Sequence, residues 1–330
     1  MLRQIASLTV VSRRRPKGTG NAEVRRCLIP KTQSSPGPFI PGSGRRSDCL
    51  ARESAATSTW ASPNRATALK ELLAHPATAI RKLGLVQSVY RDWPAILLAW
   101  AGDRSAVRIF KLRNGLRMQM RPRTNDFYVV DEILRLGVYS PPGWGIAEDA
   151  IVVDVGAHIG VFTVLASRFA TSGRVIAIEP QADNFAMLKA NIALNGCRNV
   201  VPVNAALAGM EGPRKLYLSP TACSHSLSPI FDRSIIVPAR TLESIMHEFA
   251  LDRIDYLKVD CEGAEYEIIE GLPDRVLEAV SSIAMEYHPA PAESGVSDLS
   301  DILTAHGFRV AVRPTWARGG MLYAVREASR

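Results

Sequence analysis

Blocks of apolar residues alternate with amphipathic blocks from residue 150 onward. Five apolar runs predict buried strands: Ile151–Val155, Val175–Glu179, Val200–Ala206, Ile254–Asp260 and Ile283–Tyr287. Segments with helical spacing follow them: Val161–Phe169, Asn184–Leu194, Leu242–Phe249, Ala264–Glu270 and Leu299–His306. Strands that alternate with helices predict an α/β fold, in which a mostly parallel Rossmann-like sheet carries helices on both faces.

The C-terminal part of the pattern departs from this alternation. Two further strands, Phe308–Arg313 and Met321–Arg326, are separated only by residues 314–320. A parallel connection needs a crossover of a dozen or more residues, so this pair is predicted to be an antiparallel hairpin. The sheet is therefore expected to end in a terminal antiparallel strand.

The region before residue 150 contains weaker signals. Ala68–Leu83 has helical spacing, and Val107–Arg121 alternates around Asn114-Gly115, which predicts a hairpin. A helix is expected at Tyr128–Leu136, ending at Gly137. We therefore divide the chain into a tail (1–66), helices and a hairpin that pack on the core (67–149), and a catalytic domain (150–330).

The amino-acid composition is most unusual in the N-terminal tail. Residues 1–66 carry ten Arg and two Lys against three acidic residues, so the net charge of +8 lies in this segment and the remainder is close to neutral. The segment is poor in periodic apolar residues, which predicts disorder; an organellar transit peptide and a misassigned start codon are the alternatives. A nearly neutral core argues against a nucleic-acid partner.

The five cysteines show neither C-x-x-C nor zinc-ligand spacing, and their odd number suits a reducing compartment. Apolar runs stay well below the roughly 20 residues that a membrane span requires. We expect a cytoplasmic protein without a membrane span. The oligomeric state cannot be inferred from the sequence.

The first motif with chemical content lies at the end of the first core strand. Asp154-x-Gly156-x-x-x-Gly160 joins a strand to a helix, and Glu179 ends the next strand 23 residues after Gly156. Glycines at such a turn let a ligand and the helix approach the backbone closely. A carboxylate at this spacing commonly binds ribose hydroxyls, so we expect a nucleoside-bearing cofactor.

Two features of this motif distinguish between cofactors. A dinucleotide site prefers G-x-G-x-x-G, and here His158 replaces the middle glycine. Asp154 would repel a pyrophosphate but attract an ammonium group. We interpret the site as one for S-adenosyl-L-methionine, with His158 as a pocket wall and Asn204 near the adenine. The alternative is that Asp154 only caps the following helix.

A second motif, Lys258-Val-Asp-Cys-Glu-Gly-Ala-Glu265, ends the fourth strand and begins a helix. The carboxyl end of this strand should lie beside the reactive end of the cofactor. Charged groups crowded at a sheet edge are common at functional sites. Glu262 and Glu265 also fit a simpler reading, in which they only favour the helix dipole.

Together these motifs resemble the FkbM-type methyltransferase family. The matching segments are Val153–Gly160, Ile178–Pro180, Leu188–Asn195, Asn204–Leu207 and Lys258–Glu265, with Asn114-Gly115 and Thr124–Asp126 upstream. The resemblance covers roughly residues 105–326. It implies a class I methyltransferase fold and S-adenosylmethionine-dependent O-methylation of a small molecule, a sugar or glycan, or a natural product.

An alcohol is a weak nucleophile at neutral pH, so a positioned base should assist methyl transfer. Asp260 is our first candidate and His288, after the fifth strand, the second; Glu262 completes the catalytic set. We expect no metal, although carboxylates and His288 at this edge could converge on one.

Two other enzyme classes remain open from the sequence. A NAD-dependent oxidoreductase is disfavoured by the missing middle glycine and by the terminal hairpin. A nucleic-acid methyltransferase is disfavoured by the neutral core and by the absence of Asn-Pro-Pro-aromatic after the fourth strand.

Overall fold

The structure, a computed structural model, describes most of the chain from residue 107 and a short stretch before it. The described residues are 84, 86–96, 107–122, 124–219, 225–228, 231–289, 295–316 and 319–326. The tail at 1–66 and the helix expected at Ala68–Leu83 lie outside them.

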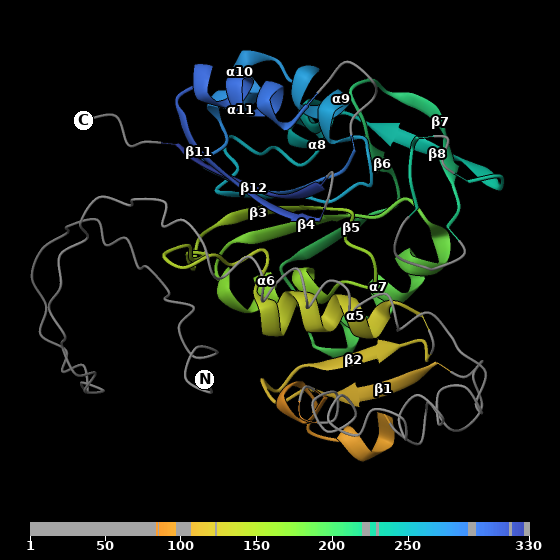
Figure 1. Cartoon of the computed structure of the whole chain (residues 1–330). Helices are drawn as coiled ribbons and strands as arrows, with labels where there is room; N and C mark the ends of the chain where they lie inside the picture. Colours follow the sequence, from red (N-terminus) through yellow and green to blue (C-terminus); the bar gives the residue numbers. More distant parts are fainter. Residues whose placement is uncertain are drawn as a thin grey trace, which may run out of the picture.

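A seven-stranded sheet forms the centre of the molecule, with the strand order β11-β12-β10-β9-β3-β4-β5 (Figure 1). Its strands are β3 (Ile151–Val155), β4 (Arg174–Ile178), β5 (Val200–Val203), β9 (Tyr256–Val259), β10 (Ser282–Tyr287), β11 (Phe308–Trp316) and β12 (Gly319–Arg326). Strands β10, β9, β3, β4 and β5 pair in parallel, whereas β12 runs antiparallel to both of its neighbours. The predicted fold class and the terminal hairpin are confirmed.

Helices cover both faces of this sheet (Figure 1). One face carries α6 (Val161–Phe169) and α7 (Ala182–Leu194); the other carries α8 (Leu242–Glu248), α9 (Glu265–Glu270), α10 (Asp274–Glu278) and α11 (Val296–Ala305). Successive side chains of a strand point to opposite faces, so Val152 and Val153 belong to different hydrophobic clusters. The near-continuous apolar strands of the sequence are thus buried on both sides.

The segment before residue 150 packs against α7 and against the hydrophobic cluster on the sheet face that carries α6 and α7. It contains the hairpin β1 (Arg108–Lys111) and β2 (Arg117–Met120), then α5 (Asp126–Asp131), which continues as a short π-helix, η2 (Glu132–Leu136). Gly137 ends it with φ 64°. The amide of Asn191 on α7 accepts from the Gln119 backbone at 2.6 Å and donates back to its carbonyl at 3.1 Å. The predicted hairpin and helix are both present.

A second sheet was not predicted. It has the order β6-β8-β7, formed by β6 (Ala206–Leu207), β7 (Gly212–Tyr217) and β8 (Ser234–Arg240). The expected strand Val200–Ala206 is therefore wrong as one element. It breaks at Asn204, whose side chain donates to the carbonyls of Glu179 and Pro180 at 2.9 and 3.1 Å and so redirects the chain.

The loop expected between the last two strands is much shorter than its sequence suggested. Strand pairing continues to Pro314 opposite Gly320, and Trp316 lies opposite Gly319. A Cβ at Gly320 would lie 2.4 Å from the carbonyl oxygen of Arg313, so the close approach requires glycine. Among the described residues, no helix combines the length and apolarity that a bilayer crossing demands.

Candidate functional site

An open cavity lies at the carboxyl ends of β3, β4 and β9; its empty space of about 810 Å³ includes solvent at the mouth. Its wall combines the glycine turn after β3, the end of β4, the motif after β9, residues of α5 and η2, and the second sheet. Polar members of the wall are Glu132, Tyr139, His158, Glu179, Asn184, His225, Lys258, Asp260 and Glu262.

Gly156 forms the tightest backbone contact of this wall. Its φ is +71°, and a Cβ at this position would lie 1.8 Å from the carbonyl oxygen of Asp260. Because no side chain can occupy that space, the two sequence motifs meet backbone to backbone. Gly160 is constrained mainly by its φ of +86°; a Cβ there would also lie 2.6 Å from the movable end of the Leu188 side chain on α7.

Glu179 is a buried carboxylate on the cavity wall. Its Oε2 accepts from the His158 amide at 2.8 Å, and its Oε1 accepts from the Gln181 amide at 2.9 Å. Burial raises the pKa of Glu179 to about 7 despite these hydrogen bonds. The side chain of Asn184 also forms a hydrogen bond with this carboxylate, so about one of its acceptor positions is left for a ligand.

His158 connects this wall to the preceding segment. The residue has φ 52°, and its Nε2 accepts from Arg121 Nη2 at 3.3 Å. Arg121 in turn forms a two-pronged ion pair with the buried Asp126. Burial lowers the pKa of His158 to about 4, so the ring is neutral. Its Nδ1 is buried and has no hydrogen-bond partner among the described residues.

Asp154 lies beneath the glycine turn and does not line the cavity. It is fully buried, and its Oδ2 accepts from the Thr163 hydroxyl at 2.5 Å. Its Oδ1 lies 3.3 Å from Lys258 Nζ, which also donates to the Gly156 carbonyl at 2.7 Å. Burial would lower the pKa of Lys258, but the charges of Asp154 and Asp260 raise it. Lys258 therefore remains charged and joins β9 to β3.

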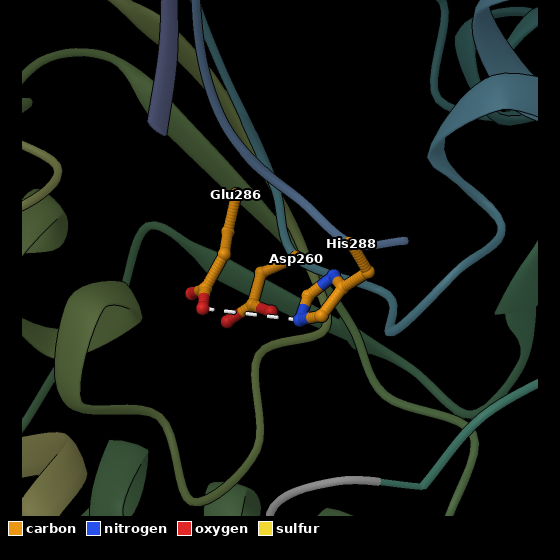
Figure 2. Close-up of side chains that lie close together, drawn as sticks. All are labelled: Asp260, Glu286 and His288. Carbon is orange, nitrogen blue, oxygen red and sulfur yellow. Dashed lines mark ion pairs between the residues drawn. The ribbon is translucent and has the colours of Figure 1, made fainter. Parts of the chain in front are cut away.

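A group of acids gathers at the ends of β9 and β10 (Figure 2). The Tyr139 hydroxyl is 2.9 Å from Asp260 Oδ2 and 3.1 Å from Glu286 Oε2. Burial, together with the charge of Asp260, raises the pKa of Glu286 well above its usual range. Burial and the same charge raise the pKa of Glu132 to about 7. Two of the acids therefore resist ionisation in the free protein.

His288, which follows β10, contacts three acidic side chains. Its Nδ1 is 2.9 Å from Glu265 Oε1, and its Nε2 is 3.1 Å from Glu262 Oε2 and 3.8 Å from Glu286 Oε1. Burial would lower the pKa of His288, but the hydrogen bond and charges of its acidic neighbours raise it to about 10. A ring that is already protonated cannot accept a proton, so this environment argues against His288 as the general base.

The structure brings five of the nine predicted site residues onto one cavity wall: Gly156, His158, Glu179, Asp260 and Glu262. The other four lie around that wall. Asp154 supports the turn from below, Gly160 faces α7, Asn204 braces the turn after β4, and His288 stands behind Glu262. Glu265 is buried and accepts from the Gly263 amide at 2.9 Å, the structural role allowed for it from the sequence.

Sequence reasoning missed Glu132 and Glu286. Glu286 had a usable signal, because it stands at the end of the same predicted strand, two residues before His288. Glu132 had none, since it reaches the cavity from the segment before the core.

Comparison with known proteins agrees with this geometry. The profile of the methyltransferase FkbM domain matches residues 154–310. AmbE, the AMB antimetabolite synthetase of Pseudomonas aeruginosa, is 30% identical over 233 residues, 56% of this chain and 11% of AmbE. Methyltransferase 1 of Beauveria bassiana is 26% identical over 196 residues, 52% of this chain and 77% of that protein.

Two further similarities concern a sugar-modifying enzyme and a solved structure. The hexuronic acid methyltransferase AglP of Haloferax volcanii is 26% identical over 152 residues, 46% of this chain and 62% of AglP. The crystal structure of methyltransferase FkbM from Methylobacillus flagellatus KT aligns at 15% identity with a TM-score of 0.42, over 76% of this chain and 60% of that one. This chain thus corresponds to about a tenth of AmbE and to three fifths or more of the other three.

The order of the central sheet, with its one reversed strand, defines a class I methyltransferase fold. Within that class, residues 154–310 match the methyltransferase FkbM domain.

Proposed function

We propose that this protein transfers a methyl group from S-adenosylmethionine to a hydroxyl group of a small molecule, a sugar or glycan, or a natural product. The observation that carries the proposal is the wall on which Gly156, Glu179 and Asp260 meet around one cavity. The FkbM domain match supports methyl transfer, and the similarity to AglP favours a sugar-like acceptor. The domain match offers no support for the oxidoreductase alternative.

The cavity residues fit such a cofactor. Gly156 presents bare backbone where a side chain would collide, and Glu179 offers its remaining acceptor position to a ribose hydroxyl. The Nδ1 of the neutral His158 has no hydrogen-bond partner among the described residues, so this wall has a polar atom left for the cofactor. We assign Asp154 to indirect support, because it does not line the cavity, Thr163 donates to its Oδ2, and Lys258 pairs with its Oδ1 at 3.3 Å.

When bound, the cofactor supplies an electrophilic methyl group on a sulfonium. The protein's own contribution is to align an acceptor oxygen behind that methyl group and to remove its proton. Asp260 is the base in this proposal, because its side chain is 26% exposed on the cavity wall and Tyr139 and Lys258 fix its orientation. As the oxygen–carbon bond forms and the sulfur–carbon bond breaks, the hydroxyl proton passes to the Asp260 carboxylate.

Calorimetric titration with S-adenosylhomocysteine tests the cofactor assignment. We expect binding of one molecule per chain, and at least tenfold weaker binding for Glu179→Ala, which removes the charged ribose acceptor. Asp274→Asn, at a surface acid that is 84% exposed, is the control and should bind normally. Absence of heat with the wild-type protein would refute the proposal, and tight binding of NADH would favour the oxidoreductase instead.

The base assignment needs an acceptor, which a mass-spectrometric screen of sugars and polyketides for a gain of one methyl group can identify. Asp260→Asn should then lower the turnover by about 10²- to 10⁴-fold, the usual contribution of a general base. Cofactor affinity should stay within about threefold, because Glu179 and Gly156 are untouched. Retained turnover in this variant would contradict the role of Asp260.

A further inference from the structure

We propose that Asp260, Glu286 and His288 form a binding site for one divalent cation, Mg²⁺ or Mn²⁺, at the acceptor end of the cavity. Each residue offers one ligand atom, and the three atoms lie within 4.8 Å of one another (Figure 2). Adjacent ligands of Mg²⁺ stand about 3 Å apart and opposite ligands about 4.2 Å apart, so three atoms this close could bind one cation after an adjustment of the side chains.

The orientation of His288 supports a metal-binding role. Its Nδ1 faces Glu265 Oε1 at 2.9 Å, and Glu265 is fully buried and fixed by the amides of Cys261 and Gly263. A carboxylate that accepts from one ring nitrogen leaves the other nitrogen directed at the metal, an arrangement common to histidine ligands. Here that other nitrogen, Nε2, faces Glu262 and Glu286. A bound cation would replace the proton on Nε2.

The balance of charge at this end of the cavity also favours a cation. The acidic side chains of Asp260, Glu262, Glu265 and Glu286 gather there around the Tyr139 hydroxyl and the His288 ring. Among the described residues, the positive groups that pair with them are Lys258, which Asp154 also shares, and His288. Two carboxylates, one imidazole and water form a donor set that suits Mn²⁺ and Mg²⁺.

The site would act on the acceptor, and this part rests on the proposed methyl transfer. Asp260 lines the cavity, so the cation would have open positions facing it. A hydroxyl bound there is held in place and loses its proton more readily. One Asp260 oxygen would bind the cation while the other receives the proton. The acceptor would then be a compound with two neighbouring oxygens, such as a sugar diol or a hydroxy acid, that can chelate the cation.

Titration of the chelator-treated, full-length protein with Mn²⁺, followed by electron paramagnetic resonance, tests the site itself. We expect one Mn²⁺ per chain, displaceable by Mg²⁺, with a ¹⁴N coupling from an imidazole ligand in the pulsed spectrum. Glu286→Gln and His288→Gln should weaken binding at least tenfold, and Glu265→Gln should weaken it about 10- to 100-fold by releasing the ring.

Two variants outside the cluster serve as matched controls. Glu267→Gln changes an acid that pairs with Arg214, and His306→Gln changes a histidine that pairs with Asp274. Both should bind Mn²⁺ within twofold of the wild type. Absence of binding, binding without nitrogen coupling, or equal losses in the controls would each overturn the inference, and the first two need no variant to fold.

The two proposals can fail separately. Mn²⁺ binding is measured without cofactor, and S-adenosylhomocysteine binding is measured without metal. Binding of Mn²⁺ alone would refute only the cofactor assignment, whereas binding of S-adenosylhomocysteine alone would refute only the cation site.

Discussion

At the scale of single residues, Gly156 is the position where geometry allows least change. Gly156→Ala would combine an unfavourable positive φ with overlap against the Asp260 carbonyl, so we expect a loss of about 3 kcal/mol or more in the free energy of unfolding. Gly196→Ala is the matched control, because Gly196 has φ +66° but no atom within 4 Å of its Cβ position. It should lose only about 1 kcal/mol in urea denaturation. Equal losses would contradict the contact.

Glu179 makes cofactor binding depend on pH. Its pKa is raised to about 7, from about 4.3 in an unfolded chain, so ionisation costs native stability as the pH rises through 7. The ionised carboxylate is the better acceptor for ribose hydroxyls. The affinity for S-adenosylhomocysteine should therefore increase about tenfold between pH 6 and pH 8.

Glu179→Gln supplies the control for this dependence. It cannot ionise, so its weaker affinity should stay nearly constant over the same interval in calorimetry. A wild-type affinity that does not change with pH would show that Glu179 is already ionised.

Some residues of the site could be predicted from the neighbouring sequence, and others only from the folded structure. Gly156 and Glu179 could be placed from the sequence because each follows directly from the end of a strand. The exclusion of Asp154 from the cavity could not, because it depends on Lys258 arriving from β9, over one hundred residues later. Tyr139 likewise becomes part of the acid cluster only through the folded arrangement of the segment before the core.

At the scale of elements, Arg326 fixes the reversed strand β12 to its surroundings. Its guanidinium donates to the carbonyls of Leu277, Val280 and His306 at 2.6, 3.0 and 2.5 Å. Arg326→Ala would leave these carbonyls without their donors and should cost about 2 kcal/mol in thermal unfolding. Arg309→Ala, at an exposed position on β11, should cost less than about 0.5 kcal/mol. Similar losses in both variants would contradict the anchoring role.

Elements with strong periodicity were predictable, and α6 matches its expected bounds. The β6-β8-β7 sheet was not. Its strand β8 alternates only weakly, with three exposed residues at its start, and β6 has two residues. Such short strands are defined by their pairing partners rather than by their own sequence.

At the scale of the whole molecule, the described residues that line the cavity all fall between 129 and 262. We therefore expect a chain that begins at residue 67 to bind S-adenosylhomocysteine within twofold of the full-length protein. Its isoelectric point should be clearly lower, because residues 1–66 carry the excess of Arg and Lys. A tenfold loss of affinity in calorimetry would show that the tail contributes to the site.

The position of β12 affects when the protein can acquire its final form during synthesis. This strand lies between β10 and β11, inside the sheet rather than at its border. A ribosome must therefore deliver residues up to Arg326 before β11 gains its neighbour in the described sheet. Until then β10 presents an unpaired flank, so the nascent chain depends on rapid completion, or on a chaperone, to avoid pairing with other chains.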